Sequence, residues 1–417
     1  MRFTIVILFL FPLMASGQIE DHFNDYIFKD STSIKFGIRS RALNNSTALT
    51  ANVLNSVMYG GYIDETQKKS MLNRANPINT TGSIWNSSVY VSKKIDSIKG
   101  KPQSDLHFFL NMADKQENLG VFTEEALKLV LNGNKQFAGQ TISIDPLGFN
   151  SFQYKKFQIG FGKGFSNGNG ISLGISFLYG QQNRQGLADR LDLIFSEYGD
   201  RISTDAEIDI YETEIAQSAF TYNGAGASID IQGRFKVQLL PDSSNAGSFN
   251  FSISDLGFIN WHGNSTHTKV DTFYSYQGTY IENIFDPNSE SSGDPSNIWD
   301  SVSVKTNKSF TLQTPATIHF YLIQEYNNMI FTVGGAHRIS AYYYPYFYGK
   351  FGYQLNSAFT VSGQINAGGY GNFGGGAEIA YSKTNFLLTL GSTNLEGFIA
   401  PTKWGGQSVY FQVAFKL

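Results

Sequence analysis

The residues of this chain that could do chemistry are scattered. The histidines are His22, His107, His262, His267, His319 and His337. They show none of the helical pair spacings that zinc enzymes use. His262 and His267 fall in a polar segment and could bind a metal, although solvated loop residues are the simpler interpretation. Serine, histidine and aspartate are abundant enough that a hydrolase triad cannot be inferred from their presence. We therefore expect no enzyme activity, no cofactor and no metal site.

Two glycine-rich stretches resemble phosphate-binding loops at first sight. They are residues 160–164 (Gly-Phe-Gly-Lys-Gly) and residues 368–371 (Gly-Gly-Tyr-Gly). Nucleotide binding requires a strand, a tight turn and a helix in succession, with an acidic residue further on. Neither stretch has this context. Glycines in turns, or on the crowded inner face of a barrel, explain both stretches better.

Composition excludes further classes of function. The chain has 31 Lys and Arg residues against 34 Asp and Glu residues, which gives a net charge of −3 and no basic patch for a nucleic acid. It has no cysteine, so disulfides and thiolate metal sites are absent. Aromatic residues make up 15% of the chain, and there are 42 glycines but 10 prolines.

Apolar and polar residues alternate over most of the chain, as expected for strands with two different faces. In residues 229–239, the odd positions are mostly apolar and the even positions polar. Residues 406–417 repeat the pattern, with apolar side chains at Val409, Phe411, Val413, Phe415 and Leu417. The phase slips at Ser254–Asp255, as a β-bulge or a strand end would require.

A soluble sandwich and a membrane barrel can share such alternation, and the N-terminus favours the membrane barrel. Met1–Arg2 is basic, residues 3–14 are almost all apolar, and small residues follow at 15–17. This is the pattern of a secretory signal peptide, which we expect to be cleaved between Gly17 and Gln18. A spanning helix would need about 20 apolar residues. The aromatic run Tyr342–Tyr348 suits a girdle at the membrane boundary, or alternatively a packed core corner.

These features predict an all-β protein, a transmembrane antiparallel β-barrel of about 14 strands with two short helices, formed by residues 18–417. Roughly twelve to sixteen alternating runs can be counted, and bacterial single-chain barrels have even strand numbers. Apolar side chains then face lipid and polar ones face the lumen. The candidate lumen-facing residues are Asp230, Gln232, Arg234, Lys236, Gln238 and His319.

Two stretches show helical periodicity instead. Thr123–Leu131 has an N-cap threonine, acidic residues in the first turn and a following Gly133. Leu187–Tyr198 has apolar residues at i, i+4, i+7 and i+8. Helices here could plug the lumen, lie at the periplasmic rim or serve as plain connectors. Residues 262–309 are expected to form a long polar loop.

Several segments resemble a group of uncharacterised outer-membrane barrel proteins of Bacteroidota. They are residues 132–144, 157–163, 224–230, 249–261 and 312–315, and the resemblance extends from about residue 110 to the end. That family is similar in architecture to the long-chain fatty-acid outer-membrane transporters and to barrel proteins of gliding-associated secretion. The resemblance implies no catalytic residues. Leu417 departs from the aromatic residue that is common at the end of such barrels.

Two functions remain open after these exclusions. The first is passive transport of small hydrophobic molecules across the outer membrane. The second is a non-transporting barrel that scaffolds partner proteins or secretion machinery at the cell surface. The expected partners are outer-membrane lipid, the barrel-assembly machinery through the C-terminal strand, and either a small hydrophobic ligand or a surface protein. Transport expects an internal apolar pocket or a lateral opening, whereas scaffolding expects a filled lumen and an adhesive rim.

Overall fold

The computed structural model describes residues 26–27, 33–98, 101–198, 200–239, 247–262, 264–276, 280–281, 291–292, 295–339 and 342–417. The expected signal peptide, with Gly17 and Gln18, lies outside the described residues. So does residue 263 and most of the stretch 277–294 within the expected polar loop.

Fourteen antiparallel strands form a closed ring, in which each strand pairs with the next and the last pairs with the first. In ring order they are β1 (Ile34–Ser46), β2 (Ile78–Ile98), β3 (Lys101–Thr123), β5 (Leu147–Gly164), β6 (Gly170–Phe195), β8 (Gly224–Val237), β9 (Gly247–Trp261), β15 (Ala316–Tyr326), β16 (Met329–Ile339), β17 (Tyr344–Gln354), β18 (Phe359–Gly369), β19 (Phe373–Lys383), β20 (Phe386–Ser392) and β21 (Gln407–Lys416). The predicted all-β barrel is therefore confirmed.

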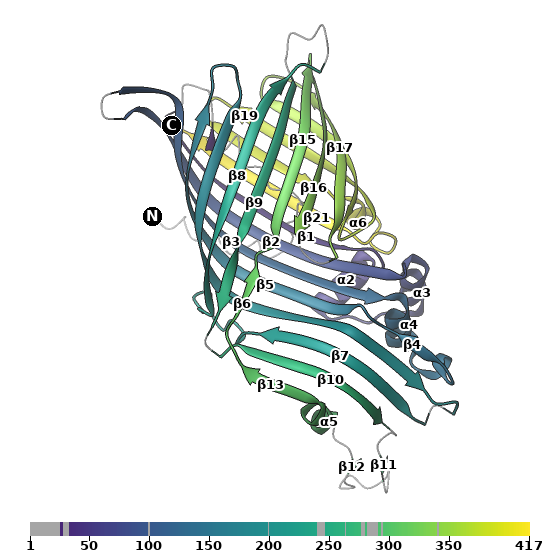
Figure 1. Cartoon of the computed structure of the whole chain (residues 1–417). Helices are drawn as coiled ribbons and strands as arrows, with labels where there is room; N and C mark the ends of the chain where they lie inside the picture. Colours follow the sequence, from purple (N-terminus) through teal and green to yellow (C-terminus); the bar gives the residue numbers. More distant parts are fainter. Residues whose placement is uncertain are drawn as a thin grey trace, which may run out of the picture.

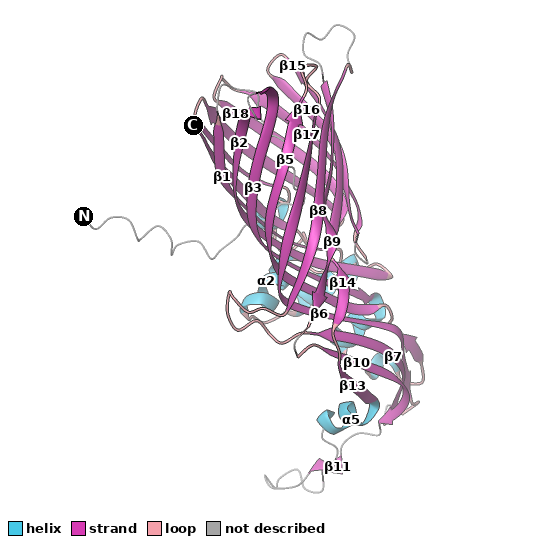
Figure 2. Ribbon diagram, turned by 60° about the vertical axis from the view of Figure 1, so that its left-hand side comes forward, coloured by secondary structure: helices cyan, strands magenta, loops and turns pink. Residues whose placement is uncertain are grey.

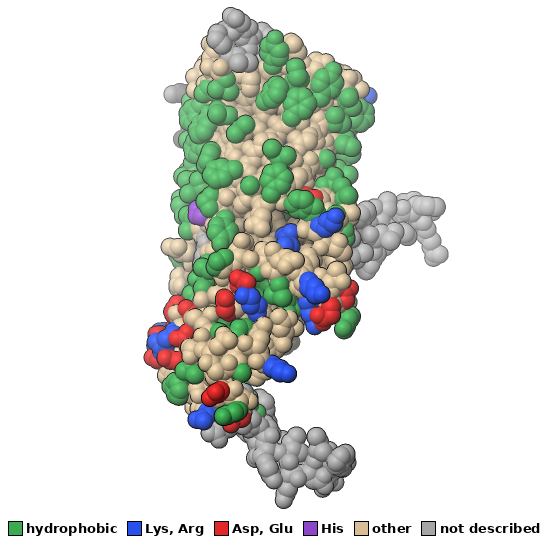
Figure 3. Space-filling model, turned by 90° about the vertical axis from the view of Figure 1, so that its right-hand side faces the viewer, with side chains coloured by type: hydrophobic (Ala, Val, Ile, Leu, Met, Phe, Trp, Pro, Cys, Tyr) green, Lys and Arg blue, Asp and Glu red, His purple; other side chains and the backbone are tan. Residues whose placement is uncertain are grey.

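The barrel is apolar outside and polar inside. In β6, the outward Leu173 and Ile175 are 53% and 54% exposed, whereas the inward Ser172 and Ser176 are buried. Hydrophobic side chains are spread over the barrel wall, and most of the charged side chains in this view lie below it (Figure 3). An outward apolar band on a closed barrel is the arrangement that a lipid bilayer requires. The chain is an outer-membrane β-barrel.

The two ends of the barrel differ in their connections. At the end that carries Ile34 and Leu417, the strands are joined by tight turns such as Asn327–Asn328 and Thr384–Asn385. At the other end most of the connections are long, for example residues 47–77, and only those after β16 and β18 are short. Outer-membrane barrels generally have short periplasmic turns and long extracellular loops. Helices α2, α3 and α4 lie at the end with the long connections (Figure 1), which by this pattern is the outer side of the membrane.

Several strands continue past the barrel and form a sheet beyond it (Figure 1). A tilted strand needs about 9–11 residues to cross a bilayer, but β2, β3, β5 and β6 have 21, 23, 18 and 26 residues. Beyond the barrel, β6 pairs with β7 (Ile202–Glu212), β7 with β10 (Thr266–Tyr276), and β10 with β13 (Ser303–Asn307). We call β7, β10, β13 and the distal part of β6 the extension sheet. Shorter strands are β4 (Thr141–Ser143), β11 (Tyr280–Ile281), β12 (Ser291–Ser292) and β14 (Phe310–Gln313).

The described helices are all short. They are α2 (Ala51–Tyr59), α3 (Glu65–Arg74), α4 (Glu124–Asn132), α5 (Pro295–Val302), α6 (Glu396–Ile399) and the 3-10 helix η2 (Lys135–Phe137). Of the helices in the described residues, none is long and apolar enough to cross a membrane. The prediction of a helix at Thr123–Leu131 is confirmed by α4, whose Ala126 N–H donates to the Thr123 hydroxyl. The prediction of two helices in total is too low.

The helix predicted at Leu187–Tyr198 is wrong, because β6 runs through it to Phe195. The register between β6 and β7 shifts between Ala188 and Arg190, which marks a bulge. One extra residue changes the alternation, so that Leu187 and Leu191, four residues apart, lie on opposite faces of the strand. The spacing imitates a helix although the backbone is extended.

The polar loop expected at residues 262–309 also needs correction. Residues 266–276 and 303–307 form β10 and β13, which pair with each other, and α5 lies between them in sequence. His267 is part of β10, where its Nε2 lies 2.5 Å from an Asp209 carboxylate oxygen and its ring stacks on Tyr211. It is therefore a sheet residue and not a loop residue.

The two-faced wall generates a testable prediction. Replacing the lipid-facing Ile175 by arginine should destabilise the folded barrel by about 2–4 kcal/mol, the range for Arg or Lys near the bilayer midplane. Asp189→Arg introduces the same side chain on the same strand beyond the barrel, where a surface change costs within about 0.5 kcal/mol. Unfolding by urea in lipid vesicles measures both. Equal losses would mean that the faces are misassigned.

Candidate functional site

The lumen is the candidate site, and several residues predicted to face it lie inside. Asp230 and Gln232 on β8 and His319 on β15 are 5%, 1% and 3% exposed. The His319 Nε2 atom lies 3.0 Å from the Tyr348 hydroxyl. Arg234 is half-buried and donates to the Asn250 side chain. The remaining two candidates, Lys236 and Gln238, are exposed at the end of the barrel that carries the termini, and Gln238 lies past the last residue of β8.

A buried cluster of charges lies on the lumenal side of one part of the ring, which runs from β3 through β5, β6 and β8 to β9. The Lys156 ammonium on β5 lies 2.6 Å from an Asp230 carboxylate oxygen and 2.8 Å from one of Asp255 on β9. Lys115 on β3 donates to the other oxygen of Asp255. The side chains of Lys156, Asp230 and Asp255 are 2%, 7% and 4% exposed. We call these four residues the charge layer, and they tie together four strands of the wall.

A bulge in β9 brings Asp255 into the lumen. Between the pairs Ile229–Leu256 and Ile231–Ile253, two residues of β9 oppose one of β8. Asp255 adopts a φ of 59° there, and its N–H donates to an Asp230 carboxylate oxygen at 2.9 Å. The slip in alternation predicted at Ser254–Asp255 is thus confirmed. The sequence interpretation missed that this bulge turns the Asp255 carboxylate into the lumen, although alternation would have placed it on the lipid face.

Polar side chains extend the charge layer toward the end that carries the termini. They surround a narrow space, which is lined by Arg39, Asn86, Ser88, Asn111, Ala113, Lys115, Lys156 and Asp230. Arg39 donates to the Ser88 hydroxyl at 2.8 Å and to the Tyr26 hydroxyl at 3.1 Å. This space is polar, so it does not suit a hydrophobic ligand.

An aromatic layer lies between the charge layer and the termini, and it includes a segment that precedes the first strand. Tyr26 and Ile27 are 1% and 5% exposed and contact the inward-facing Tyr90, Phe109 and Ala414. The rings of Tyr26 and Phe109 are parallel, with centroids 3.8 Å apart. Both residues are thus buried among side chains of the lumen, although they precede β1 in the sequence. We call these two residues the N-terminal plug.

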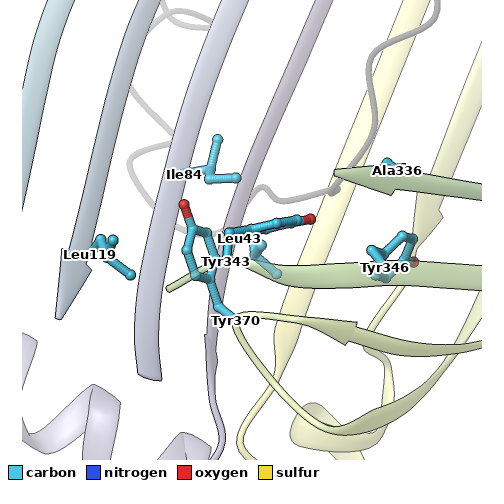
Figure 4. Packing of buried hydrophobic residues seen from close by; sticks show 7 residues of the cluster. All are labelled: Leu43, Ile84, Leu119, Ala336, Tyr343, Tyr346 and Tyr370. Carbon is cyan, nitrogen blue, oxygen red and sulfur yellow. The ribbon is translucent and has the colours of Figure 1, made fainter. Parts of the chain in front are cut away.

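A tyrosine layer fills the opposite end of the lumen. Tyr343, Tyr346 and Tyr370 are buried and pack with Leu43, Ile84, Leu119 and Ala336 (Figure 4). Tyr343 and Tyr370 come from the short connections after β16 and β18. The Tyr370 hydroxyl donates to Glu117, whose other oxygen accepts from Arg338 at 2.7 Å.

The tyrosine layer separates the two interpretations of the aromatic run at residues 342–348. Tyr343 and Tyr346 are 4% and 0% exposed and form a packed core corner. Tyr344 and Phe347 are 43% and 57% exposed and face outward, as a girdle would. Tyr343 precedes β17, and the register of β17 shifts between Tyr344 and Phe347, so the run has side chains in both environments.

The charge, aromatic and tyrosine layers pack and pair the lumenal side chains at three levels of the described barrel. Among the described residues, no three His, Asp or Glu side chains are placed to hold a metal ion. The participants that sequence reasoning missed are Lys115, Lys156, Asp255 and the N-terminal plug. Lys156 lies on the polar side of an alternating strand, which was the available signal for it. Tyr26 and Ile27 precede the strands and gave none.

The charge layer predicts an asymmetry between two adjacent lysines. Lys156→Met leaves two buried carboxylates short of a partner, and breaking a buried pair costs about 3–5 kcal/mol. Lys155→Met breaks the outward pair with Asp114, whose side chain is 42% exposed, and should cost about 0–1 kcal/mol. Urea unfolding in vesicles compares the variants. A loss for Lys155→Met as large as for Lys156→Met would contradict the layer's structural role.

Similar folds occur among solved structures, at low similarity. The toluene transporter TodX of Pseudomonas putida has 9% identity and a TM-score of 0.41, over 93% of this chain and 89% of that one. A FadL homologue of Pseudomonas aeruginosa has 9% identity and a TM-score of 0.41, over 93% of this chain and 90% of that one. The translocator domain of the autotransporter NalP from Neisseria meningitidis has 7% identity and a TM-score of 0.36, over 95% of this chain and 92% of that one. These values are too low to support an argument about function.

No curated protein matches this sequence. Residues 48–391 match a family of unknown function, which confirms the resemblance to an uncharacterised family, whereas an origin in Bacteroidota stays a prediction. The match covers most of the barrel and the extension sheet. The chain belongs to the family of unknown function DUF5723.

Proposed function

We propose that this barrel passively transports small hydrophobic molecules across the outer membrane and that its lumen is closed at rest. The observation that supports the proposal is the aromatic site occupied by Tyr26 and Ile27. The site is formed by wall residues, but its occupant is a segment outside the barrel ladder. Such an occupant can leave without breaking any hydrogen bond between strands.

The contacts of the plug indicate what could replace it. The walls offer the rings of Tyr90 and Phe109 to an apolar body, while Arg39 and Gln158 lie within 3.1 and 3.4 Å of the Tyr26 hydroxyl. Ligand sites are typically apolar with a few placed polar groups. The matching solute is a small aromatic or aliphatic molecule with one polar group.

The charge layer would be the second barrier on this route. A solute that leaves the aromatic site toward the long-loop end meets Lys156 with its two carboxylate partners. Separating buried charges is costly, so we expect almost no ion flow through the resting protein. Helix α4 is not the gate. It packs at the rim, where its Ala126 contacts Phe137, Ile142 and Phe195.

The plug can be tested by replacing Tyr26 and Ile27 together with serine. The variant should bind the hydrophobic dye N-phenylnaphthylamine several-fold more tightly, because an aromatic side chain buries about 150–250 Å² of surface that the dye can then cover. Cells that carry the variant in their outer membrane should also take up the dye faster. Dye fluorescence in detergent and in cells gives both readouts.

The control carries the same two exchanges outside the lumen, at Tyr198 and Ile215, which are 88% and 74% exposed. It should bind and pass the dye like the unchanged protein, whose planar-bilayer currents should be small. Large stable currents from the unchanged protein would overturn the closed lumen. Absence of dye binding in every form would favour the second candidate function.

That second candidate is scaffolding, and the extension sheet favours it. One face carries Asp205, Glu207 and Asp209 on β7 and Asp271 on β10, with Arg190 bonded among them. The hydrogen bond with Asp205 raises the pKa of Arg190. A rigid, mostly acidic face outside the membrane suits a protein partner with a basic surface.

A further inference from the structure

Helix α2 is fixed to the long-loop rim of the barrel by its first turn. The N–H groups of Ala51 and Asn52 donate to the carbonyl oxygens of Trp404 and Pro401, at 2.7 and 2.9 Å. Val53 is buried against Met71 of α3. These contacts satisfy backbone donors at the start of the helix and hold its orientation. The C-terminal end of the helix is therefore held in one orientation as well.

The end of α2 and the residues after it expose large apolar side chains. Val57, Met58 and Tyr59 are 68%, 52% and 66% exposed, and Tyr62 is 82% exposed. Single exposed apolar residues need no explanation, but four large ones within six positions make much of the circumference of this helix end apolar. We call these four residues the α2 patch.

One contact places the α2 patch beside the lipid-facing wall. The Asn44 side-chain amide donates to the Met58 sulfur at 3.5 Å. Asn44 lies on the outer side of β1, since its neighbours Leu43 and Asn45 are buried inside the barrel. Two residues earlier, Ala42 pairs with the outward Trp85, about 7 Å away along the strand. Figure 2 shows α2 standing out from the flank of the barrel.

We propose that the α2 patch is an interfacial anchor that lies in the lipid of the outer membrane at the long-loop side. It is continuous with the lipid-facing wall, it is held there by Asn44, and it contains two tyrosines. Tyrosine rings prefer the boundary between headgroups and acyl chains, and an interfacial helix buries its apolar face about 5–10 Å deep. Helix α3 begins three residues later with Glu65, Lys68 and Lys69, which return the chain to water.

The absence of cysteine makes the test direct, because a single introduced cysteine is a unique labelling site. A nitroxide is attached to Met58→Cys in phosphatidylcholine vesicles, and its collisions with oxygen and with a water-soluble nickel chelate are measured. Leu390→Cys, at an outward position of β20 that is 53% exposed, gives the lipid reference. Lys69→Cys, on the exposed side of α3, gives the water reference.

The expected result is an oxygen-to-nickel collision ratio at Met58 that is several-fold above the ratio at Lys69 and approaches that at Leu390. A ratio equal to that at Lys69 would overturn the proposal, because the patch would then face water. Low collision with both reagents would overturn it too, because a protein or a second copy would cover the patch. Tyr62→Cys repeats the measurement independently, and heat-modified migration on gels verifies that each variant is folded.

Discussion

The structure depends on one constraint, namely that backbone polar groups in lipid must find their partners within the protein. The pairing of β21 with β1 meets it by closing the ladder from Lys35–Lys416 to Asn44–Gln407. The Leu417 N–H donates to the Ile34 carbonyl at 2.8 Å, and the Leu417 carbonyl accepts from the N–H groups of Ile34 and Ser33, which extends the seam. A closed ladder has no edge, and every other feature is built on the two faces that it leaves. Recognition of β21 by an assembly machinery stays a prediction.

In a closed barrel in lipid, apolar side chains face outward and polar side chains face inward, the reverse of a soluble protein. The lumen must then accommodate the polar side chains. A ring of fourteen strands is too wide for its own side chains to meet at the centre without long ones. Lysine, arginine and tyrosine supply that length, and each must find a partner because buried charges and hydroxyls are costly alone. The pairs Lys156–Asp230 and Arg338–Glu117 therefore fill space and satisfy charge together. Filling and polarity are two consequences of the same closure.

The sequence was sufficient for features that repeat with period two. Alternation in residues 229–239 and 406–417 predicts the strands, their outward faces and the inward Asp230 and Gln232. It does not predict partners on non-adjacent strands, because the contact between Lys156 and Asp255 depends on ring geometry and joins residues 99 positions apart in sequence. It also gave no sign that Tyr26 returns into the barrel, because a single ring in an irregular segment carries no periodicity.

The missed Asp255 and the wrong helix at Leu187–Tyr198 share a physical cause, which is the insertion of single residues into strands. At Asp255 an extra residue turns a carboxylate inward, and at Asp189 another creates the helical spacing that misled the sequence interpretation. A third lies at Gln181, where β5 pairs Gln153 with Gln182 but Tyr154 with Gly180. Just there β6 loses β8 as its neighbour and takes up β7, and the Gln181 side chain donates to the Ala219 carbonyl to cover the gap. A bulge bends and twists its strand. The bulge at Asp255 places a charge in the lumen, and the bulge at Gln181 lies where the extension sheet leaves the barrel.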